Sequence, residues 1–352
     1  MTKRFSIRNK LIIIFGLLIL VACITLGLLA VRKARKAVTE KVEVHLIDKA
    51  TDTANIIDGR LNAFLQLLEG ISRMPAFRDP AISYTEKTRM LDKEAAFNNQ
   101  ILDLNISDRK GNLYTSDGKS TNISHLAWYG ASNGGQTFFA EPFMSPVLNK
   151  LVIAVIVPVM DNNNNHVASL VALIDGLWLT DQIDDIVVGQ TGYCYILGIK
   201  GNTIAHKNSE LVTKAANAID MAKNDASLRE TANFQKRSIE IDESEIGYYS
   251  YKGQRNIASF ATIKSTDWSV IIAAPVNEFL GTVAVLRASL LGIGVIILVI
   301  ALVVVFFVAQ AMVKPIGVTV EALRNIAQGD GDLTVRLPIH GNDEVTDLSE
   351  YF

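Results

Sequence analysis

The stretch HLAWYGASNGG, residues 125–135, sets two aromatic side chains beside a glycine-rich turn. Trp128 and Tyr129 can serve two purposes there: they can pack into a core, or they can form aromatic walls around a small molecule. Adjacent residues of a strand face opposite sides, so only one of the pair needs to meet a cavity. Because the stretch holds no catalytic motif, binding is the chemistry that it favours.

Catalytic signatures are also missing from the rest of the sequence. There is no Walker loop and no nucleophile elbow, and the five histidines are scattered without metal-ligand spacing. Cys194 is the only cysteine outside the apolar runs, so no disulfide is expected in the large middle segment. The formal charge of −2 and the lack of a basic patch argue against a nucleic-acid partner. We therefore expect no enzyme, no cofactor and no metal.

Two apolar runs are long enough to cross a membrane as helices. Leu11–Val31 holds 21 residues without a charge and Ala288–Met312 holds 25, and a helix needs about 20 to cross roughly 30 Å of hydrocarbon. The first run could instead be a signal peptide, but it exceeds the usual core of about 7 to 15 residues and no small-residue cleavage site follows. The second could be a core helix, but it is apolar on every face. We expect two membrane spans.

The orientation does not follow from charge alone, because basic residues flank both ends of the first span. Long segments translocate largely regardless of charge. We expect both termini in the cytoplasm and the roughly 255 residues between the spans outside, which predicts a multi-pass protein of the inner membrane with a periplasmic or extracellular middle segment.

The first element of that middle segment is a long helix over about residues 31–74, which would reach about 60 Å. One apolar stripe repeats at spacings of 4, 3, 4 and 3: Ile57, Leu61, Phe64, Leu68 and Ile71. Such a stripe favours core packing and a dimer seam over a ligand surface.

Strands follow the helix in two similar sets. QILDLNISDRKGNLYTSD predicts a hairpin with its turn at residues 108–111, and apolar strands follow at Leu151–Met160 and Val167–Ile174. GYCYILGIKGNTIAHKN predicts a second hairpin, which a helical stretch and three more strands follow. The fold class is therefore α+β, with two hairpin-and-sheet units in tandem.

This order of elements resembles the double Cache sensors of bacterial chemoreceptors over residues of about 33–284. The resemblance rests on the ordered set of DRKGN, WY, ALID, GIKGN and DWSVIIAAPV between two spans. It implies a tandem PAS-like fold in which the membrane-distal unit holds the ligand. The expected domains are a cytoplasmic N-terminus (1–10), a first span (11–31), a sensor (32–287, distal unit about 75–180, proximal unit about 181–280), a second span (288–312) and an incomplete HAMP domain (313–352).

The segment after the second span resembles a HAMP linker. Pro315 follows the span directly, the GDGDLT connector separates two helical stretches, and Glu344 begins the second stretch, while Thr346 stands where the family often has glycine. The resemblance implies a parallel four-helix bundle in a homodimer, with Pro315 and Glu344 as signal-relay residues. Since the chain stops at Phe352, we expect the output domain to lie beyond it.

The candidate ligand residues come from the same resemblance. Amino-acid-binding members resemble Tyr-x4-Arg-x-Trp-Tyr, in which the arginine grips the ligand carboxylate. Trp128 and Tyr129 match, but Leu126 stands at the arginine position and Thr121 at the tyrosine position. Leucine cannot form the paired hydrogen bonds that fix a carboxylate. The downstream positions carry Phe143, Ser145 and Asp175.

A box of aromatic walls with one carboxylate suits an ammonium-bearing ligand, through cation–π contact and an ion pair. We therefore expect an amine in this pocket. An amino acid remains an alternative, because a protonated His125 could hold its carboxylate. Asp175 could instead cap the helix that follows it.

The resemblance implies a chemotaxis receptor, whose partners are its own copy, the membrane, and a chemotaxis histidine kinase with its coupling protein. HAMP linkers also precede histidine kinases and nucleotide cyclases, so the sensor portion of such a protein is the alternative. GDGDLT is closer to the chemoreceptor form.

Overall fold

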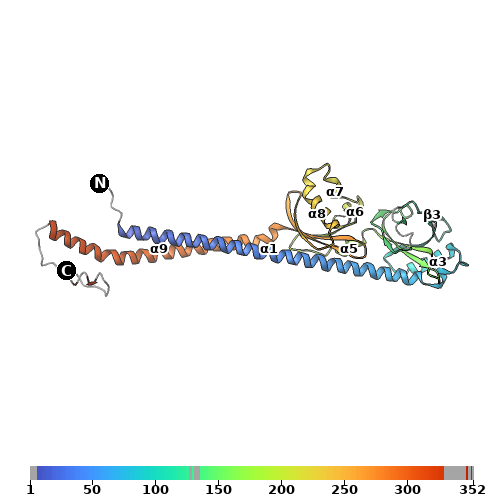
Figure 1. Cartoon of the computed structure of the whole chain (residues 1–352), viewed down its shortest axis with the longest axis horizontal. Coiled ribbons are helices and arrows are strands. Elements are labelled where there is room, and N and C mark those ends of the chain that lie inside the picture. Colours follow the sequence, from blue (N-terminus) through green and yellow to red (C-terminus); the bar gives the residue numbers. More distant parts are fainter. Residues whose placement is uncertain (1–5, 127–128, 131–134, 329–345, 348–349, 351–352) are drawn as a thin grey trace. The chain divides into compact units, whose positions relative to one another are not determined.

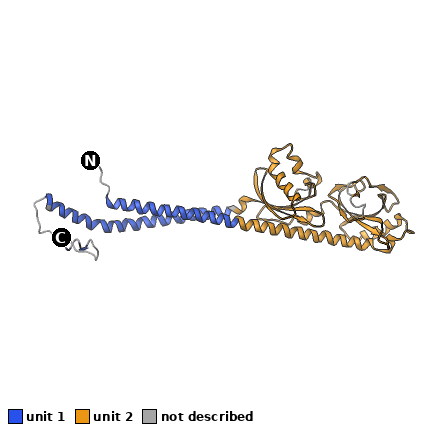
Figure 2. Ribbon diagram, in the orientation of Figure 1, with its two compact units in different colours: residues 1–38, 280–352 blue, residues 39–279 orange. Residues whose placement is uncertain are grey.

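The computed structural model describes residues 6–126, 129–130, 135–328, 346–347 and 350. The chain divides into two compact units, which are coloured separately in Figure 2. Residues 1–38 and 280–352 make up one unit, and residues 39–279 make up the other. The second unit holds the strands that the structure describes, and Figure 1 shows that they follow one another along the chain as two separate sheets.

Two helices account for most of the first unit. Helix α1 (Ile7–Ser72) is continuous through the first apolar run, and α9 (Val276–Gln328) contains the second run and Pro315. Both are long and apolar enough to cross a membrane by length and composition. The expected pair of apolar helices around an α+β segment is therefore confirmed.

The first sheet has seven strands in the order β3-β2-β1-β7-β6-β4, with β5 also pairing with β6. All its pairings are antiparallel. Its strands are β1 (Ile101–Asp108), β2 (Asn112–Tyr114), β3 (Ser120–Asn122), β4 (Phe138–Phe139), β5 (Phe143–Met144), β6 (Leu151–Met160) and β7 (His166–Asp175). Gly111 closes the predicted β1–β2 turn at a φ of 81°, where a side chain would be strained.

The second sheet has five antiparallel strands in the order β10-β11-β12-β8-β9. They are β8 (Tyr193–Leu197), β9 (Thr203–His206), β10 (Ile246–Tyr251), β11 (Gln254–Ile263) and β12 (Trp268–Pro275). The central strand β12 leads directly into α9, so this sheet is joined without a loop to the second apolar helix.

Short helices fill the connections. Before the first sheet lie α2 (Pro75–Arg78) and α3 (Tyr84–Ala95), and α5 (Trp178–Ile183) follows it. Between β9 and β10 lie α6 (Ser209–Thr213), α7 (Ala218–Met221), the 3-10 turn η1 (Ala226–Leu228) and α8 (Arg229–Glu240).

One apolar cluster joins α1 to the near face of both sheets. The predicted stripe on α1 is buried, with Ile57 and Leu68 fully covered, which confirms its role in the core. Each sheet also has a far face, turned away from α1, with its own apolar cluster. The far face of the first sheet is built by Leu113, Ile123, Tyr129, Ala140, Val152, Ala154, Ile156, Val171 and Leu173. The far face of the second sheet is covered by Phe234 of α8.

Candidate ligand-binding site

Two of the predicted site residues lie in one row across the far face of the first sheet. Phe143 of β5 is paired with Val152 of β6, and Val152 is paired with Asp175 of β7. Directly opposed residues of antiparallel strands project to the same side. Since Val152 belongs to the far-face cluster, Phe143 and Asp175 flank that cluster from neighbouring strands.

A polar strip lies next to this row on β1. Asp103, Asn105 and Ser107 alternate with Leu104 and Ile106, and the two apolar residues belong to the core cluster with α1. The pairing register sets Asp103 opposite Leu173, Asn105 opposite Val171 and Ser107 opposite Ser169. Because Leu173 and Val171 belong to the far-face cluster, the strip shares that face.

Burial shapes the chemistry of the strip. Burial raises the pKa of Asp103. A hydrogen bond of 2.6 Å from the side-chain amide of Asn105 to the Asp103 carboxylate opposes this rise. Ser107 is fully buried, and its hydroxyl oxygen has no hydrogen-bond partner among the described residues. A partly desolvated carboxylate and an unsatisfied hydroxyl are groups that a polar ligand can satisfy.

At the Ser107 end of the strip, the neighbouring groups are basic. His166 Nε2 lies 2.9 Å from the Ser169 hydroxyl. Burial and the nearby charge of Arg109 lower the pKa of His166, so its imidazole is neutral at pH 7. The acidic group and the basic groups are therefore separated along the strip.

Tyr129 has a structural role in this arrangement. Its side chain is 1% exposed within the far-face cluster, and its hydroxyl donates a hydrogen bond of 2.8 Å to the Asp108 carbonyl. Leu126, at the position of the family's arginine, packs against the same cluster. Trp128 lies outside the described residues, as does Glu344 of the relay pair. The use of Tyr129 as a ligand wall therefore stays a prediction.

Asp175 forms a turn at the end of β7, and its ligand role stays a prediction. Its side chain is exposed at the end of β7, and Oδ1 accepts a hydrogen bond of 2.8 Å from the Leu177 amide just before α5. This bond forms a turn before α5. It is not the expected helix cap, because the N-cap residue of α5 is Leu177, which makes no side-chain cap hydrogen bond. The bond engages one oxygen of the carboxylate, and the side chain still stands in the row with Phe143.

The other predicted residues lie away from the row. Thr121 is exposed on the edge strand β3, and His125 is exposed in the turn after it. Ser145 is buried, and its hydroxyl accepts hydrogen bonds from the Val147 and Leu148 amides at 3.3 and 3.2 Å. The structure thus sets Phe143 and Asp175 in one row. It places Tyr129 in the far-face cluster with its hydroxyl bonded to Asp108, at the other end of β1, and it uses Ser145 in the β5–β6 turn.

The polar strip on β1 was not predicted from the sequence, although the sequence contains the pattern that indicates it. In ILDLNISD the polar residues fall at alternate positions, which sets them on one face of a strand. Buried Asn105 and Ser107 show that this polar face is covered and does not face solvent.

A carboxylate links the two sheets. Glu141, between β4 and β5, accepts a hydrogen bond of 3.1 Å from the Ile199 amide and another of 3.0 Å from the Asn202 side chain, both in the β8–β9 turn. A Cβ atom on Gly198 would overlap the Glu141 carboxylate, which would then have to shift away from the β8–β9 turn. Since Phe143 is two residues beyond Glu141, the candidate site adjoins this contact.

A second carboxylate links the second sheet to α9. Glu278, in the first turn of α9, accepts hydrogen bonds from the Gln190 amide at 2.6 Å and from the Thr191 amide and hydroxyl. Slight burial acts to raise the pKa of Glu278, but these hydrogen bonds prevail and lower it. The residues before β8 are thereby fastened to the start of α9.

The sequence and the fold can now be compared with known proteins. The Cache domain family matches residues 30–283, and the HAMP domain family matches residues 307–352. The methyl-accepting chemotaxis protein PctB of Pseudomonas aeruginosa is 23% identical over 363 residues, covering 100% of this chain and 54% of PctB. The chain therefore spans about half the length of the chemoreceptors that it matches.

Solved structures share the fold. The ligand-binding domain of the Pseudomonas fluorescens chemoreceptor CtaA, in complex with L-isoleucine, superposes with a TM-score of 0.56 at 17% identity, covering 71% of this chain and 98% of that domain. The extracellular domain of the histidine kinase mmHK1S-Z3 gives a TM-score of 0.56 at 12% identity, covering 72% and 99%.

Two antiparallel sheets on a long helix, flanked by apolar helices, define a sensor of the double-Cache class, and the flanking helices are consistent with a membrane receptor. The chain belongs to the Cache domain family, and its C-terminal segment is a HAMP domain.

Proposed function

We propose that this chain is the sensor and HAMP portion of a membrane chemoreceptor that binds an ammonium-bearing ligand on the far face of the first sheet. The observation that carries the proposal is the placement of two carboxylates on that face, Asp103 on β1 and Asp175 on the adjacent strand β7. Among the described residues that the register or the apolar cluster assigns to this face, every formal charge is acidic.

An ammonium group suits this face because it relieves the cost of the partly buried Asp103 carboxylate by pairing with it. The Phe143 ring, on β5 across β7 and β6, would contact another part of the ligand. Trp128 and Tyr129 would supply further aromatic wall. Alkyl amines are cationic at pH 7, as the ordinary pKa of about 10.4 for lysine illustrates.

The residues on this face are less suited to a ligand that carries a carboxylate. Leu126 packs where related receptors would supply a guanidinium. Arg109 lies six residues beyond Asp103, roughly 20 Å of extended chain, whereas one carbon separates the two charged groups of an α-amino acid. An amine is therefore the first choice. Amino acids are the second, because the related CtaA domain binds L-isoleucine and because His125 stands one residue from Leu126.

The signal would leave the site through the two carboxylate contacts. Ligand binding at β5 would move Glu141, which holds the β8–β9 turn, and β8 pairs with β12 from Ser269 to Ala273. The strand β12 leads into α9, and Glu278 fastens α9 to the residues before β8. The displacement would then reach the HAMP domain, where Pro315 and Glu344 would relay it in a homodimer.

A matched ligand panel tests the proposed ligand class. Isoamylamine, L-leucine and 4-methylpentanoate share one side chain and carry an ammonium group, both charges or a carboxylate, and phenethylamine, L-phenylalanine and 3-phenylpropionate form a second set. We expect the full chain in lipid nanodiscs to bind the amines and to bind the carboxylates at least tenfold more weakly in calorimetric titration. Stronger binding of the carboxylates would overturn the proposal, and stronger binding of the amino acids would favour the second choice.

The output is proposed separately from the ligand. We propose an inner-membrane receptor, with its sensor periplasmic or extracellular, that acts on a chemotaxis histidine kinase and its coupling protein. A histidine kinase or cyclase sensor is the alternative, since the mmHK1S-Z3 domain shares the fold. Fusing residues 1–352 to a chemoreceptor signalling domain or to a kinase domain tests this, because only the matching output should respond to the ligand.

A further inference from the structure

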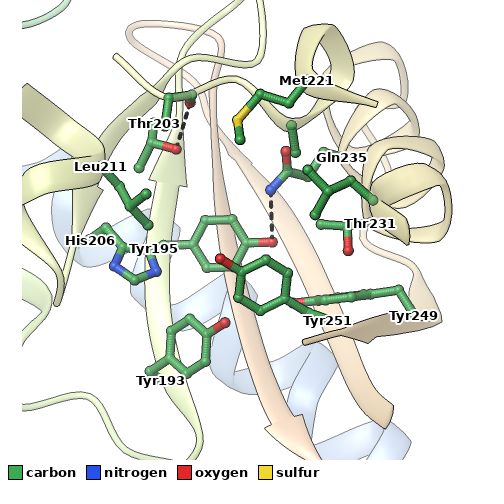
Figure 3. Close-up of a pocket in the computed structure, with 13 residues that line it drawn as sticks. Tyr193, Tyr195, Thr203, His206, Leu211, Met221, Thr231, Gln235, Tyr249 and Tyr251 are labelled. Atoms are coloured by element: carbon green, nitrogen blue, oxygen red, sulfur yellow. Dashed lines mark hydrogen bonds between the residues drawn. The ribbon is translucent and has the colours of Figure 1, made fainter. Parts of the chain in front are cut away.

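A cavity lies on the far face of the second sheet, between the sheet and the helices that cover it (Figure 3). Its volume is about 90 Å³. Its polar lining is formed by Tyr193 and Tyr195 of β8, His206 of β9, Gln235 of α8, and Tyr249 and Tyr251 of β10. Leu211 and Met221 contribute to an apolar side.

The local sequence explains how these groups meet. Tyr193 and Tyr195 are two residues apart on β8, as are Tyr249 and Tyr251 on β10, so each pair projects to one side of the sheet. Gln235 is 7% exposed on the buried side of α8, four residues after the buried Thr231. An amide on the buried side of an amphipathic helix needs partners that an apolar core does not provide.

One polar atom in this cavity has no partner. The Gln235 amide nitrogen donates to the Tyr195 hydroxyl at 3.4 Å, as Figure 3 shows, but its buried carbonyl oxygen accepts no hydrogen bond from the described residues. A buried acceptor left without a donor destabilises the empty protein. A molecule that donates a hydrogen bond to this oxygen would remove that penalty.

The cavity carries no formal charge at neutral pH. Its described lining contains no aspartate, glutamate, lysine or arginine. Burial lowers the pKa of His206 to about 4, and the Asn208 amide donates a hydrogen bond of 2.8 Å to His206 Nδ1, so the ring is neutral with its proton on Nε2. Burial also raises the pKa values of Tyr193, Tyr195 and Tyr249, so these phenols keep their protons.

We propose that this cavity is a second ligand site, for a small uncharged molecule that carries an N–H or O–H donor, in the size range of short amides and alcohols. A charged ligand would lose its hydration without gaining an opposite charge, which strongly disfavours it. An uncharged amide can donate to Gln235 and accept from a tyrosine hydroxyl, while its alkyl part meets Leu211 and Met221.

The volume limits the ligand. An engineered cavity of about 150 Å³ in another protein accepts benzene, so a cavity of 90 Å³ fits a smaller molecule. Acetamide, with four non-hydrogen atoms, is therefore the first probe. Acetate has nearly the same shape and carries a negative charge, and ethylammonium is one non-hydrogen atom smaller and carries a positive charge. Since neither is larger than acetamide, weaker binding of both would reflect charge and not size.

The position of the site gives it a way to act on the receptor. Tyr195 is paired with Ile271 and Tyr193 with Ala273 of β12, two residues before β12 ends and α9 begins. A molecule held between β8 and α8 therefore lies one strand away from the residues that lead into the second apolar helix. Such a ligand would bias the same helix as the first-sheet ligand, from a separate position.

Ligand-observed NMR titration of the full chain in lipid nanodiscs tests the charge selectivity of the site. We expect saturable acetamide binding in the millimolar range, and binding of acetate and ethylammonium at least tenfold weaker. Equal binding of all three probes, or no saturable acetamide binding, would overturn the proposal by indicating a cavity that serves only water.

Two variants locate the bound acetamide. Gln235→Leu removes the unsatisfied acceptor at nearly constant volume, and Ala218→Leu fills the cavity from the lining without touching a hydroxyl. We expect at least a tenfold loss of acetamide binding in each, while Lys236→Gln, an exposed neighbour of Gln235 on α8, leaves it unchanged. Unchanged acetamide binding in Ala218→Leu would contradict the assignment.

Isoamylamine binding in the same samples separates this proposal from the first-sheet proposal. If the Gln235→Leu and Ala218→Leu variants keep isoamylamine binding, they are folded, and a loss of acetamide binding belongs to the second sheet. If no amine binds even the unaltered chain, thermal unfolding of each variant provides the folding control, and the acetamide result still decides the second site by itself.

Discussion

The two sheets present different chemistry on equivalent faces. Each packs one face on α1 and has a far face covered by other elements, yet the first sheet carries Asp103 and Asp175 there, and the second carries neutral tyrosines and Gln235. Both sheets are antiparallel and pack on α1, so under the two proposals the far-face side chains would set the charge of an acceptable ligand. If both proposals hold, one chain would bind two classes of molecule with a single repeated fold.

The candidate sites of the two sheets differ, but the carboxylate contacts that connect the sheets to other elements are alike. In both, a carboxylate accepts hydrogen bonds from the backbone of a turn: Glu141 from the β8–β9 turn, and Glu278 from the residues before β8. Charge-assisted bonds to backbone amides are short and directional, so each can transmit a displacement. Both contacts involve the second sheet, so this sheet is the intermediate step in the path of contacts from the first sheet to α9.

The largest effect is expected from Asp103→Asn, which removes the buried charge on the first sheet and keeps the shape of the side chain. We expect isoamylamine binding to weaken by about 2 kcal/mol, roughly 30-fold, because the ammonium loses a charge-assisted partner. Acetamide binding should not change. Asp117→Asn, an exposed carboxylate in the β2–β3 turn, is the matched control, and calorimetry measures both. Unchanged amine binding in Asp103→Asn would show that the two faces do not differ in the proposed way.

The second prediction concerns acid stability and the neutral cavity. The folded-state pKa of His206, about 4, lies below the ordinary value of 6.5, so the folded protein binds this proton less readily than the unfolded chain. Its contribution to stability is therefore present above about pH 6.5 and is lost as the pH falls toward 4. We expect a loss on the order of 2 kcal/mol, after allowance for the partial exposure of the ring.

The measurement is the thermal unfolding midpoint between pH 7 and pH 4.5. His206→Asn keeps an acceptor for the Asn208 amide and cannot titrate, so its midpoint should fall less over this range. His45→Asn, on the exposed side of α1, should follow the unaltered protein. Parallel curves for all three proteins would show that the second-sheet cavity does not hold a neutral histidine.

Most of the fold could be predicted from the sequence, because its signals are local. Alternation and turn residues predicted strands Leu151–Met160 and Val167–Ile174, and the structure has β6 at Leu151–Met160 and β7 at His166–Asp175. The stripe of Ile57, Leu61 and Leu68 predicted the buried side of α1 for the same reason, since a helix brings residues three and four apart to one side.

The candidate sites were less predictable, because they depend on which strands become neighbours. Asn105 and Ser107 were readable as a polar alternation, but their burial depends on β7 and on the cover over the far face. The cavity on the second sheet forms only where Tyr195 and Tyr249 lie close to Gln235 of α8. The two tyrosines are 54 residues apart in the sequence. No spacing rule connects these three residues, and each tyrosine alone is a plausible core residue.

Glu278→Gln should have a smaller effect on stability. It removes the charge but leaves one acceptor for the Gln190 amide, so we expect a cost of about 1 kcal/mol in thermal unfolding. Both ligands should still bind. A cysteine introduced at Val285 can report on α9 through cross-links between copies of the chain in nanodiscs. In Glu278→Gln, we expect the cross-linking yield to change less on addition of either ligand than in the unaltered chain. Glu243→Gln, exposed before β10, should leave that response intact, and an intact response in Glu278→Gln would exclude this contact from the path.

The smallest effect is the one that tests whether the two sheets communicate. If isoamylamine on the first sheet moves Glu141, it should change acetamide affinity on the second by about threefold, a coupling of roughly 0.6 kcal/mol. Linkage requires acetamide to change amine affinity by the same factor, which checks the measurement internally. In Glu141→Gln the factor should fall toward one while both separate affinities persist, and Glu94→Gln on α3 should preserve it. A coupling that survives Glu141→Gln would mean that the sheets communicate through other contacts, such as the Phe139 ring of β4 against the Trp268 ring of β12 or the packing of both sheets on α1. The hydrogen bonds to the β8–β9 turn would then only hold that turn in place.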